Sequence, residues 1–131
     1  MKDLLVDLDG TLAVPAPRPY IGPPDLSTVA AISQLAMRGY RVVLYTSRPP
    51  EEESEIQRWC RRLGLPVARV VCGKPQGILI DDLSISPLDI SGPGELVLRV
   101  QELAKRLGEI RDLYRLPVWL DPSLTRRDPE V

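Results

Sequence analysis

The sequence contains no histidine, no asparagine and no phenylalanine, and it has only two cysteines. Without histidine, a Ser-His-Asp triad and a phosphohistidine mechanism are excluded, so acid–base chemistry must use carboxylates, Lys, Tyr or water. Zinc is unsupported for the same reason. The cysteines, Cys60 in an expected helix and Cys72 at an expected strand end, do not suggest a disulfide framework. We interpret them as buried thiols in a reducing compartment.

Long apolar runs and an excess of one charge are also missing. No stretch approaches the roughly 20 apolar residues that span a membrane, and residues 1–15 lack a secretory signal, so we expect a cytoplasmic protein. The net charge of −1 does not mark a nucleic-acid-binding protein, although it leaves a local basic patch open. The length of 131 residues fits one domain, expected over residues 1–120, with a flexible tail at 121–131.

The order of apolar segments predicts alternating strands and helices. Short apolar runs alternate with stretches of helical periodicity. They predict strands at 2–8, 41–46, 67–72 and 77–81, and helices at 26–38, 49–63 and 95–114. This order is typical of an α/β protein with a doubly wound, Rossmann-like parallel sheet and helices on both faces.

Three segments have more specific interpretations. The Pro-rich stretch at 14–24 cannot form regular helix or central strand, so we expect a stiff loop near the entrance of a site. The helix at 95–114 has heptad-spaced apolar residues, which fit either packing against the sheet or a dimer helix. Residues 116–120, LPVWL, suit an edge strand or a partner contact.

The most informative stretch is residues 3–11, DLLVDLDGT. Its apolar residues fit a strand buried on both faces of a parallel sheet, yet the strand ends in Asp7 and Asp9. Because side chains alternate along a strand, both carboxylates are expected to point the same way, and a cation between them would relieve their repulsion. Gly10 permits a sharp turn that brings backbone close to a ligand.

This pattern resembles the opening motif of the haloacid dehalogenase (HAD) superfamily, whose members mostly transfer phosphoryl groups. The resemblance implies that Asp7 is the nucleophile, forming an aspartyl-phosphate, and that Asp9 is the acid/base. Three further elements of that family occur here in the same order. They are Thr46, with Ser47 as the alternative, after strand 41–46; Lys74 in CGKPQG; and Asp82 in GILIDD, with Asp81 orienting it or contacting a metal-bound water.

By the same resemblance, Asp7, Asp82 and the backbone carbonyl of Asp9 hold Mg²⁺, and Thr46 and Lys74 hold the phosphoryl oxygens. The implied strand order is four-one-two-three. The connections between the expected elements leave no room for a cap domain, so the chain resembles a small capless member. Candidates for substrate contact beside these motifs are Gly10, Thr11, Arg18, Tyr20, Ser47 and Arg48. For Arg48, pairing with an acid of the following helix is the alternative.

The function expected from this resemblance is a Mg²⁺-dependent phosphatase. A capless site needs another way to exclude water, and a partner subunit of a homo-oligomer covering a small substrate such as a sugar phosphate is one solution. A polynucleotide 3′-phosphatase or a phosphoprotein phosphatase is the alternative, because a large substrate covers the site itself. A non-catalytic binding or scaffold domain that keeps the fold is the alternative from another class. A phosphomutase is disfavoured by the missing cap.

Overall fold

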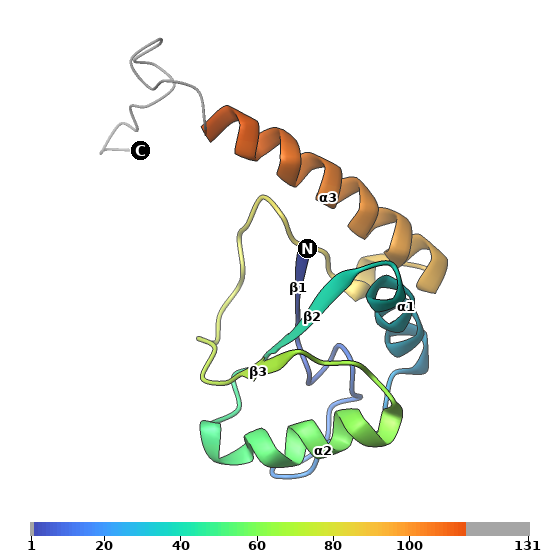
Figure 1. The fold of residues 1–131 in the computed structure, drawn as a ribbon. Coiled ribbons are helices and arrows are strands. Elements are labelled where there is room, and N and C mark those ends of the chain that lie inside the picture. The colour runs from blue at the N-terminus through green and yellow to red at the C-terminus, as the bar shows by residue number, and fades with distance from the viewer. Residues whose placement is uncertain (1, 115–131) are drawn as a thin grey trace, which may run out of the picture.

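The computed structural model describes residues 2–114 of the chain, shown in Figure 1. The predicted edge strand at 116–120 and the tail at 121–131 lie outside the described residues. The centre is a three-stranded parallel sheet in the order β1-β2-β3. The strands are β1 at Lys2–Val6, β2 at Tyr40–Tyr45 and β3 at Arg69–Val71. Three of the predicted strands are therefore confirmed: β1 and β3 are shorter than expected, and β2 has the expected length but begins and ends one residue earlier.

The three predicted helices are confirmed, as α1 at Leu26–Met37, as η1 at Pro50–Glu52 with α2 at Glu53–Leu63, and as α3 at Pro93–Tyr114. A short 3-10 helix that was not predicted, η2, lies at Pro87–Asp89. The carboxylate of Asp25 accepts the Thr28 N–H at 3.1 Å and begins α1. Gly64, with a φ of 69°, ends α2 in the left-handed region that glycine adopts without strain. Acidic residues in the first turn of α2 and arginines in its last turn also match the helix dipole.

One buried cluster covers one face of the sheet. Both crossovers run in the same direction across the sheet, so right-handed connections place α1 and α2 on the same side. The sheet contributes Val6, Val42, Leu44 and Val70 to this cluster, and the helices contribute Val29, Ala31, Ile32, Leu35, Ile56, Cys60, Leu96, Val97 and Val100. The start of α3 therefore packs into the core, but it does so mainly against α1 and not against the sheet as expected.

Both cysteines are free, as the sequence suggested. Cys60 is buried in the cluster, and this burial raises the pKa of its thiol to about 11. A thiol with that pKa is protonated and unreactive near neutral pH, so Cys60 has a packing role.

The opposite face of the sheet carries no helix among the described residues. Val43 is buried on this face, whereas its register partner Leu5 is 64% exposed. The structure is therefore a small α/β fold of Rossmann-like type, and the prediction of helices on both faces is not reproduced in residues 2–114. The physical reason is the common direction of the two crossovers, which places both helices on one side.

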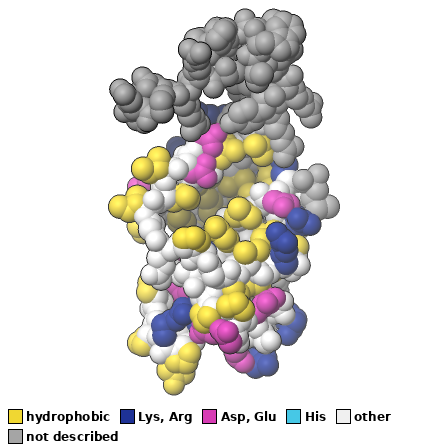
Figure 2. Space-filling view, turned by 90° about the vertical axis from the view of Figure 1, so that its left-hand side faces the viewer, with side chains coloured by type: hydrophobic (Ala, Val, Ile, Leu, Met, Phe, Trp, Pro, Cys, Tyr) yellow, Lys and Arg dark blue, Asp and Glu magenta, His cyan; other side chains and the backbone are white. Residues whose placement is uncertain are grey.

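The fourth predicted strand, at 77–81, is wrong for this structure. The chain between β3 and η2 has no strand, and it arches away from the sheet in Figure 1. Ile78 and Ile80 are 96% and 94% exposed, and Figure 2 shows hydrophobic side chains around a hollow on this side. The apolar run has strand propensity, but a strand forms only where a neighbouring backbone pairs with it.

The Pro-rich loop at 14–24 is closed at its base by backbone hydrogen bonds. The Val14 N–H donates to the Pro23 carbonyl, and the Asp25 N–H donates to the Leu12 carbonyl, both at 2.8 Å. Gly22 lies so close to Val14 that a Cβ added there would overlap the Val14 carbonyl. The neck of the loop therefore requires glycine at this position.

The described residues include no helix with the length and apolar character needed to cross a membrane.

Gly22→Ala is expected to destabilise the protein by about 1–3 kcal/mol, because the added methyl group must displace backbone. The matched control is Gly77→Ala, where an added Cβ meets no atom within 4 Å. Urea denaturation of both variants measures the effect. Equal unfolding free energies for the two variants would contradict the tight neck.

Candidate functional site

The carboxyl ends of the three strands meet at one edge of the sheet. Val6 pairs with Leu44 in the register of β1 and β2, and Tyr45 pairs with Val71 in that of β2 and β3. The residues that follow are therefore neighbours in space. In parallel α/β sheets this edge is where ligands bind.

Backbone hydrogen bonds fix the segments after β2 and β3 against each other. The Thr46 N–H donates to the Val71 carbonyl, and the Lys74 N–H donates to the Thr46 carbonyl, both at 2.9 Å. The Gly73 N–H donates to the Arg48 carbonyl at 3.0 Å. Lys74 is thereby held across from the end of β1, although it lies 28 positions after Thr46 in the sequence.

Asp7 and Lys74 come together at this edge. The Lys74 Nζ lies 3.6 Å from the Asp7 Oδ1, and it also lies 5.4 Å from the centroid of the Tyr45 ring. The Thr11 hydroxyl donates a long hydrogen bond of 3.4 Å to the Asp7 Oδ2. The Asp7 side chain remains 38% exposed. It is an accessible carboxylate beside a cation, with lone pairs left for another ligand.

Asp9 does not share the environment of Asp7. The strand ends at Val6, and the Leu8 carbonyl accepts three successive N–H groups, those of Thr11, Leu12 and Ala13. Gly10 turns the chain with a φ of 82°. Strand alternation therefore stops before these residues, and the prediction that one cation sits between two parallel carboxylates is replaced by a different arrangement. Each carboxylate has its own basic partner.

The partner of Asp9 is Arg48, whose side chain is 1% exposed. The Arg48 Nε and Nη2 donate to the two carboxylate oxygens of Asp9 at 2.8 and 2.7 Å. This two-point hydrogen bond, opposed by partial burial, lowers the pKa of the Asp9 carboxyl and raises that of Arg48. Both shifts favour the charged forms of the pair.

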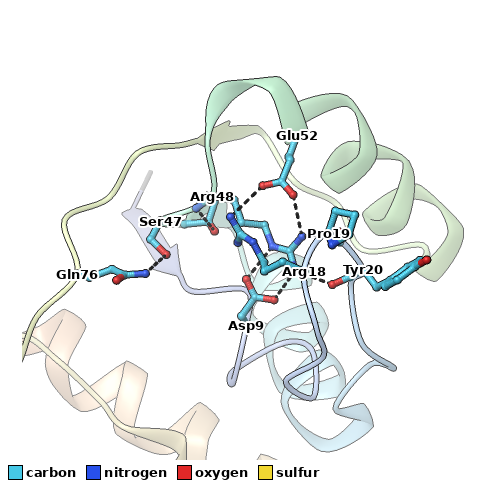
Figure 3. Close-up of polar contacts among 9 residues, drawn as sticks. Asp9, Arg18, Pro19, Tyr20, Ser47, Arg48, Glu52 and Gln76 are labelled. Atoms are coloured by element: carbon cyan, nitrogen blue, oxygen red, sulfur yellow. Dashed lines mark hydrogen bonds and ion pairs between the residues drawn. The ribbon is translucent and has the colours of Figure 1, made fainter.

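The remaining donors of Arg48 reach the Pro-rich loop and the start of α2, as Figure 3 shows. Nη2 donates to the Tyr20 carbonyl at 2.8 Å, and Nη1 donates to the Pro19 carbonyl at 3.0 Å and to the Glu52 Oε1 at 3.4 Å. All five N–H groups of the guanidinium are thus engaged. Arg48 therefore has no N–H group left to bind a substrate anion, so the prediction of a substrate contact is wrong for this structure. The alternative prediction, pairing with an acid of the following helix, is met by Glu52.

Glu52 is the site residue that sequence reasoning did not name. Its Oε2 lies 3.2 Å from the Arg18 Nη2, without hydrogen-bond geometry. Arg18, a predicted substrate contact, is therefore paired with Glu52 while its side chain stays 52% exposed. The four-residue spacing of Arg48 and Glu52 is one at which ion pairs form along a helix. Because several acids follow one another after Pro50, this spacing alone did not identify Glu52 as the partner.

The other predicted contacts occupy separate places. The Ser47 hydroxyl accepts a long hydrogen bond of 3.5 Å from the Gln76 side chain. The Tyr20 ring is 71% exposed and points away from Ser47 and Gln76 in Figure 3. Thr46 is buried, and its hydroxyl accepts the Arg48 N–H at 3.2 Å.

The predicted metal ligands are not brought together. Asp81 and Asp82 are exposed on the irregular segment after β3, and the Asp81 carboxylate accepts the Leu83 N–H at 3.3 Å. Within residues 2–114, no group of three or more acidic or cysteine side chains is placed to hold a metal ion. The donor set of this structure, Asp7 with Lys74 beside it, does not fit Mg²⁺ without a further carboxylate.

The comparisons with known proteins identify the fold alone. No protein-family model matches the chain, and the search of curated proteins finds no match. Among solved structures, the chain is similar to the crystal structure of a structural-genomics target from Vibrio cholerae, with a TM-score of 0.63 and 21% sequence identity. The similarity covers 81% of this chain and 98% of the other.

The Asp9–Arg48 pair predicts how stability depends on pH. Because folding lowers the pKa of Asp9, the pair stabilises the fold above the unfolded value of about 3.9, and this is lost as pH falls through the lower folded value. The gap in unfolding free energy between wild type and Asp9→Asn should be widest near neutral pH and shrink below about pH 4.

Urea denaturation between acidic and neutral pH measures this gap. Asp89→Asn, at an exposed acid outside the site, is the matched control for the loss of one carboxylate. A constant gap for Asp9→Asn would show that folding does not lower the pKa of Asp9.

Proposed function

We propose that this protein is a phosphatase of the HAD type that acts through an aspartyl-phosphate on Asp7. The observation that carries the proposal is the 3.6 Å approach of the Lys74 Nζ to an accessible Asp7 carboxylate, at the edge where the strands end. A lysine beside a carboxylate nucleophile offsets the repulsion between that carboxylate and an anionic phosphate.

The different environments of the two acids support different roles. Asp7 has only long contacts, so an oxygen of its carboxylate is free to attack phosphorus. Asp9 is fixed in direction by short hydrogen bonds from Arg48. Because these bonds also favour its charged form, Asp9 must take up a proton when substrate binds before it can act as the acid. We therefore propose Asp7 as the nucleophile, for which its open carboxylate is the support, and Asp9 as the acid/base.

The proposed reaction has two steps. An Asp7 oxygen bonds to phosphorus while the bond from phosphorus to the leaving oxygen breaks, and Asp9 in its protonated form gives its proton to that oxygen. A water then attacks the phosphorus of the aspartyl-phosphate, its proton passes to Asp9, and the bond to Asp7 breaks. Inorganic phosphate is released and both acids return to their starting forms. Lys74, whose side chain is accessible, is proposed to hold the phosphoryl oxygens. Thr46 is proposed to join it, which requires that its buried hydroxyl become accessible when substrate binds.

Mg²⁺ and a fourth strand belong to the same proposal. The free edge of β1 and the exposed Ile78 and Ile80 support docking of residues 77–81 beside β1, as in a doubly wound HAD-like sheet. Docking would carry Asp82 toward Asp7 and the Asp9 carbonyl, which gives the oxygen ligands that Mg²⁺ prefers. The ion, when bound, would reduce the negative charge between Asp7 and the phosphate.

A small phosphorylated substrate such as a sugar phosphate is favoured over a macromolecule. The net charge of −1 provides no excess of basic residues to bind a nucleic acid. The Arg48 side chain is buried, so it is not on the surface to contact a phosphate backbone. A polynucleotide 3′ end or a phosphoprotein remains the second candidate, because the open site would admit it.

Asp7→Asn should lower hydrolysis of 4-nitrophenyl phosphate by about a thousandfold or more, because an amide does not replace the carboxylate nucleophile. EDTA should abolish wild-type activity, and Mg²⁺ should restore it. A colorimetric rate assay measures both effects. Asp3→Asn, at an exposed acid of the same strand, is the matched control that should keep its rate.

Full activity of Asp7→Asn would exclude Asp7 as the nucleophile. Full activity in EDTA would exclude the metal while leaving the nucleophile in place. A wild-type protein that hydrolyses no phosphate ester would favour the non-catalytic binding domain.

We also expect a homo-oligomer that covers the site. Leu103 and Leu107 continue the apolar stripe of α3 beyond its packed start and are only partly buried. Leu107→Asp should therefore shift the protein toward monomer in light scattering at micromolar concentration. Met37→Asp, at an exposed residue ending α1, is the control. A wild-type monomer would contradict this and favour a large substrate.

A further inference from the structure

Arg48 carries more contacts than a surface arginine needs. Its side chain is 1% exposed, and its five N–H groups meet groups from three separate segments. These segments are the turn after β1 with Asp9, the Pro-rich loop with its two carbonyls, and the start of α2 with Glu52. Figure 3 shows them converging on one guanidinium.

Burial of a guanidinium is costly unless every donor is matched, and a buried ion pair is often no more stable than a packed apolar group. Stability alone is therefore a weak reason for this arrangement. The planar guanidinium also fixes the orientation of its partner, because two parallel hydrogen bonds set the plane of the carboxylate. A lysine ammonium cannot do this.

We propose that Arg48 is a positioning residue that sets the Asp9 carboxylate for proton transfer to the leaving group and locks the Pro-rich loop in place through the Pro19 and Tyr20 carbonyls. This inference rests on the proposed phosphatase function for its first part. Its second part, the lock on the loop, is independent of any activity.

The two parts are linked by geometry. The Nη2 that binds Asp9 at 2.7 Å also binds the Tyr20 carbonyl at 2.8 Å, so the loop and the carboxylate share one donor atom. Pro residues already restrict the loop, so little conformational entropy is lost when Arg48 holds it. The loop then shields Arg48 from water, which strengthens its hold on Asp9.

Arg48→Lys tests the first part because lysine keeps the charge and loses the fork. General acid catalysis matters most for a poor leaving group, so the variant should lose about tenfold or more of its kcat/KM on benzyl phosphate beyond its loss on 4-nitrophenyl phosphate. A merely structural role would lower both rates by the same factor. The matched control is Arg41→Lys, because Arg41 makes a similar two-point pair with Asp3 on the surface.

Chymotrypsin tests the second part without an activity assay. The bond after Tyr20 is a cleavage site in an exposed loop whose Tyr20 carbonyl is held by Arg48. Mass spectrometry of timed digests should show the fragment ending at Tyr20 forming about tenfold faster in Arg48→Lys than in wild type or Arg41→Lys, because protection requires the loop to stay closed.

The outcomes separate the inference from the proposed function. Equal losses on the two esters overturn the positioning role, and unchanged cleavage after Tyr20 overturns the lock. If wild type hydrolyses no phosphate ester, the proposed function and the positioning role fail together, and the digest still decides the lock. If Arg48→Lys does not fold, digestion of wild type at increasing urea decides the lock: cleavage after Tyr20 that appears only as the protein unfolds supports it, and rapid cleavage without urea overturns it.

Discussion

The buried guanidinium of Arg48 is the interaction on which the arrangement of this edge depends. A charge with almost no exposure is tolerated only when each N–H finds an acceptor, and here the acceptors come from segments far apart in the sequence. Asp9 lies 39 positions from Arg48, and Pro19 and Tyr20 lie 29 and 28 positions from it. If any one of these segments moved away, a buried donor would be left unpaired. The turn after β1, the loop and the start of α2 therefore hold one another in place.

This constraint also explains how two acids separated by one residue acquire different properties. Both oxygens of Asp9 accept hydrogen bonds from the guanidinium of Arg48, which stays protonated, and this lowers the pKa of the Asp9 carboxyl. Asp7 meets the flexible ammonium of Lys74 and a hydroxyl at longer range, and much of its surface stays open. Repulsion between the acids is thus relieved by two separate cations. A shared metal ion is not required to hold this arrangement, although the exposed carboxylate leaves room for one.

Local signals in the sequence predicted much of the fold and part of the site. The helices predicted at 26–38 and 49–63 lie close to the observed α1 and α2, because capping residues such as Asp25 and Gly64 act within a few residues. The run at 77–81 has the same apolar character as β1, yet Ile78 and Ile80 are exposed, since strand formation depends on a partner that periodicity does not reveal. The role of Arg48 was left between two interpretations for a similar reason: its decisive partner, Asp9, is close only in the folded chain.

The order of the strands determines how this site could exclude water. With α1 and α2 on one face, the other face and the free edge of β1 have no helix over them in the described residues, and Leu5 is exposed there. At the carboxyl edge of the strands, the connection between β1 and α1 is the segment placed to shield the proposed site. The loop at 14–24 is suited to this, because glycine closes its neck, prolines limit its conformations and a buried arginine holds its tip. The same arginine orients an acid at the edge, so shielding and proton transfer would depend on one side chain.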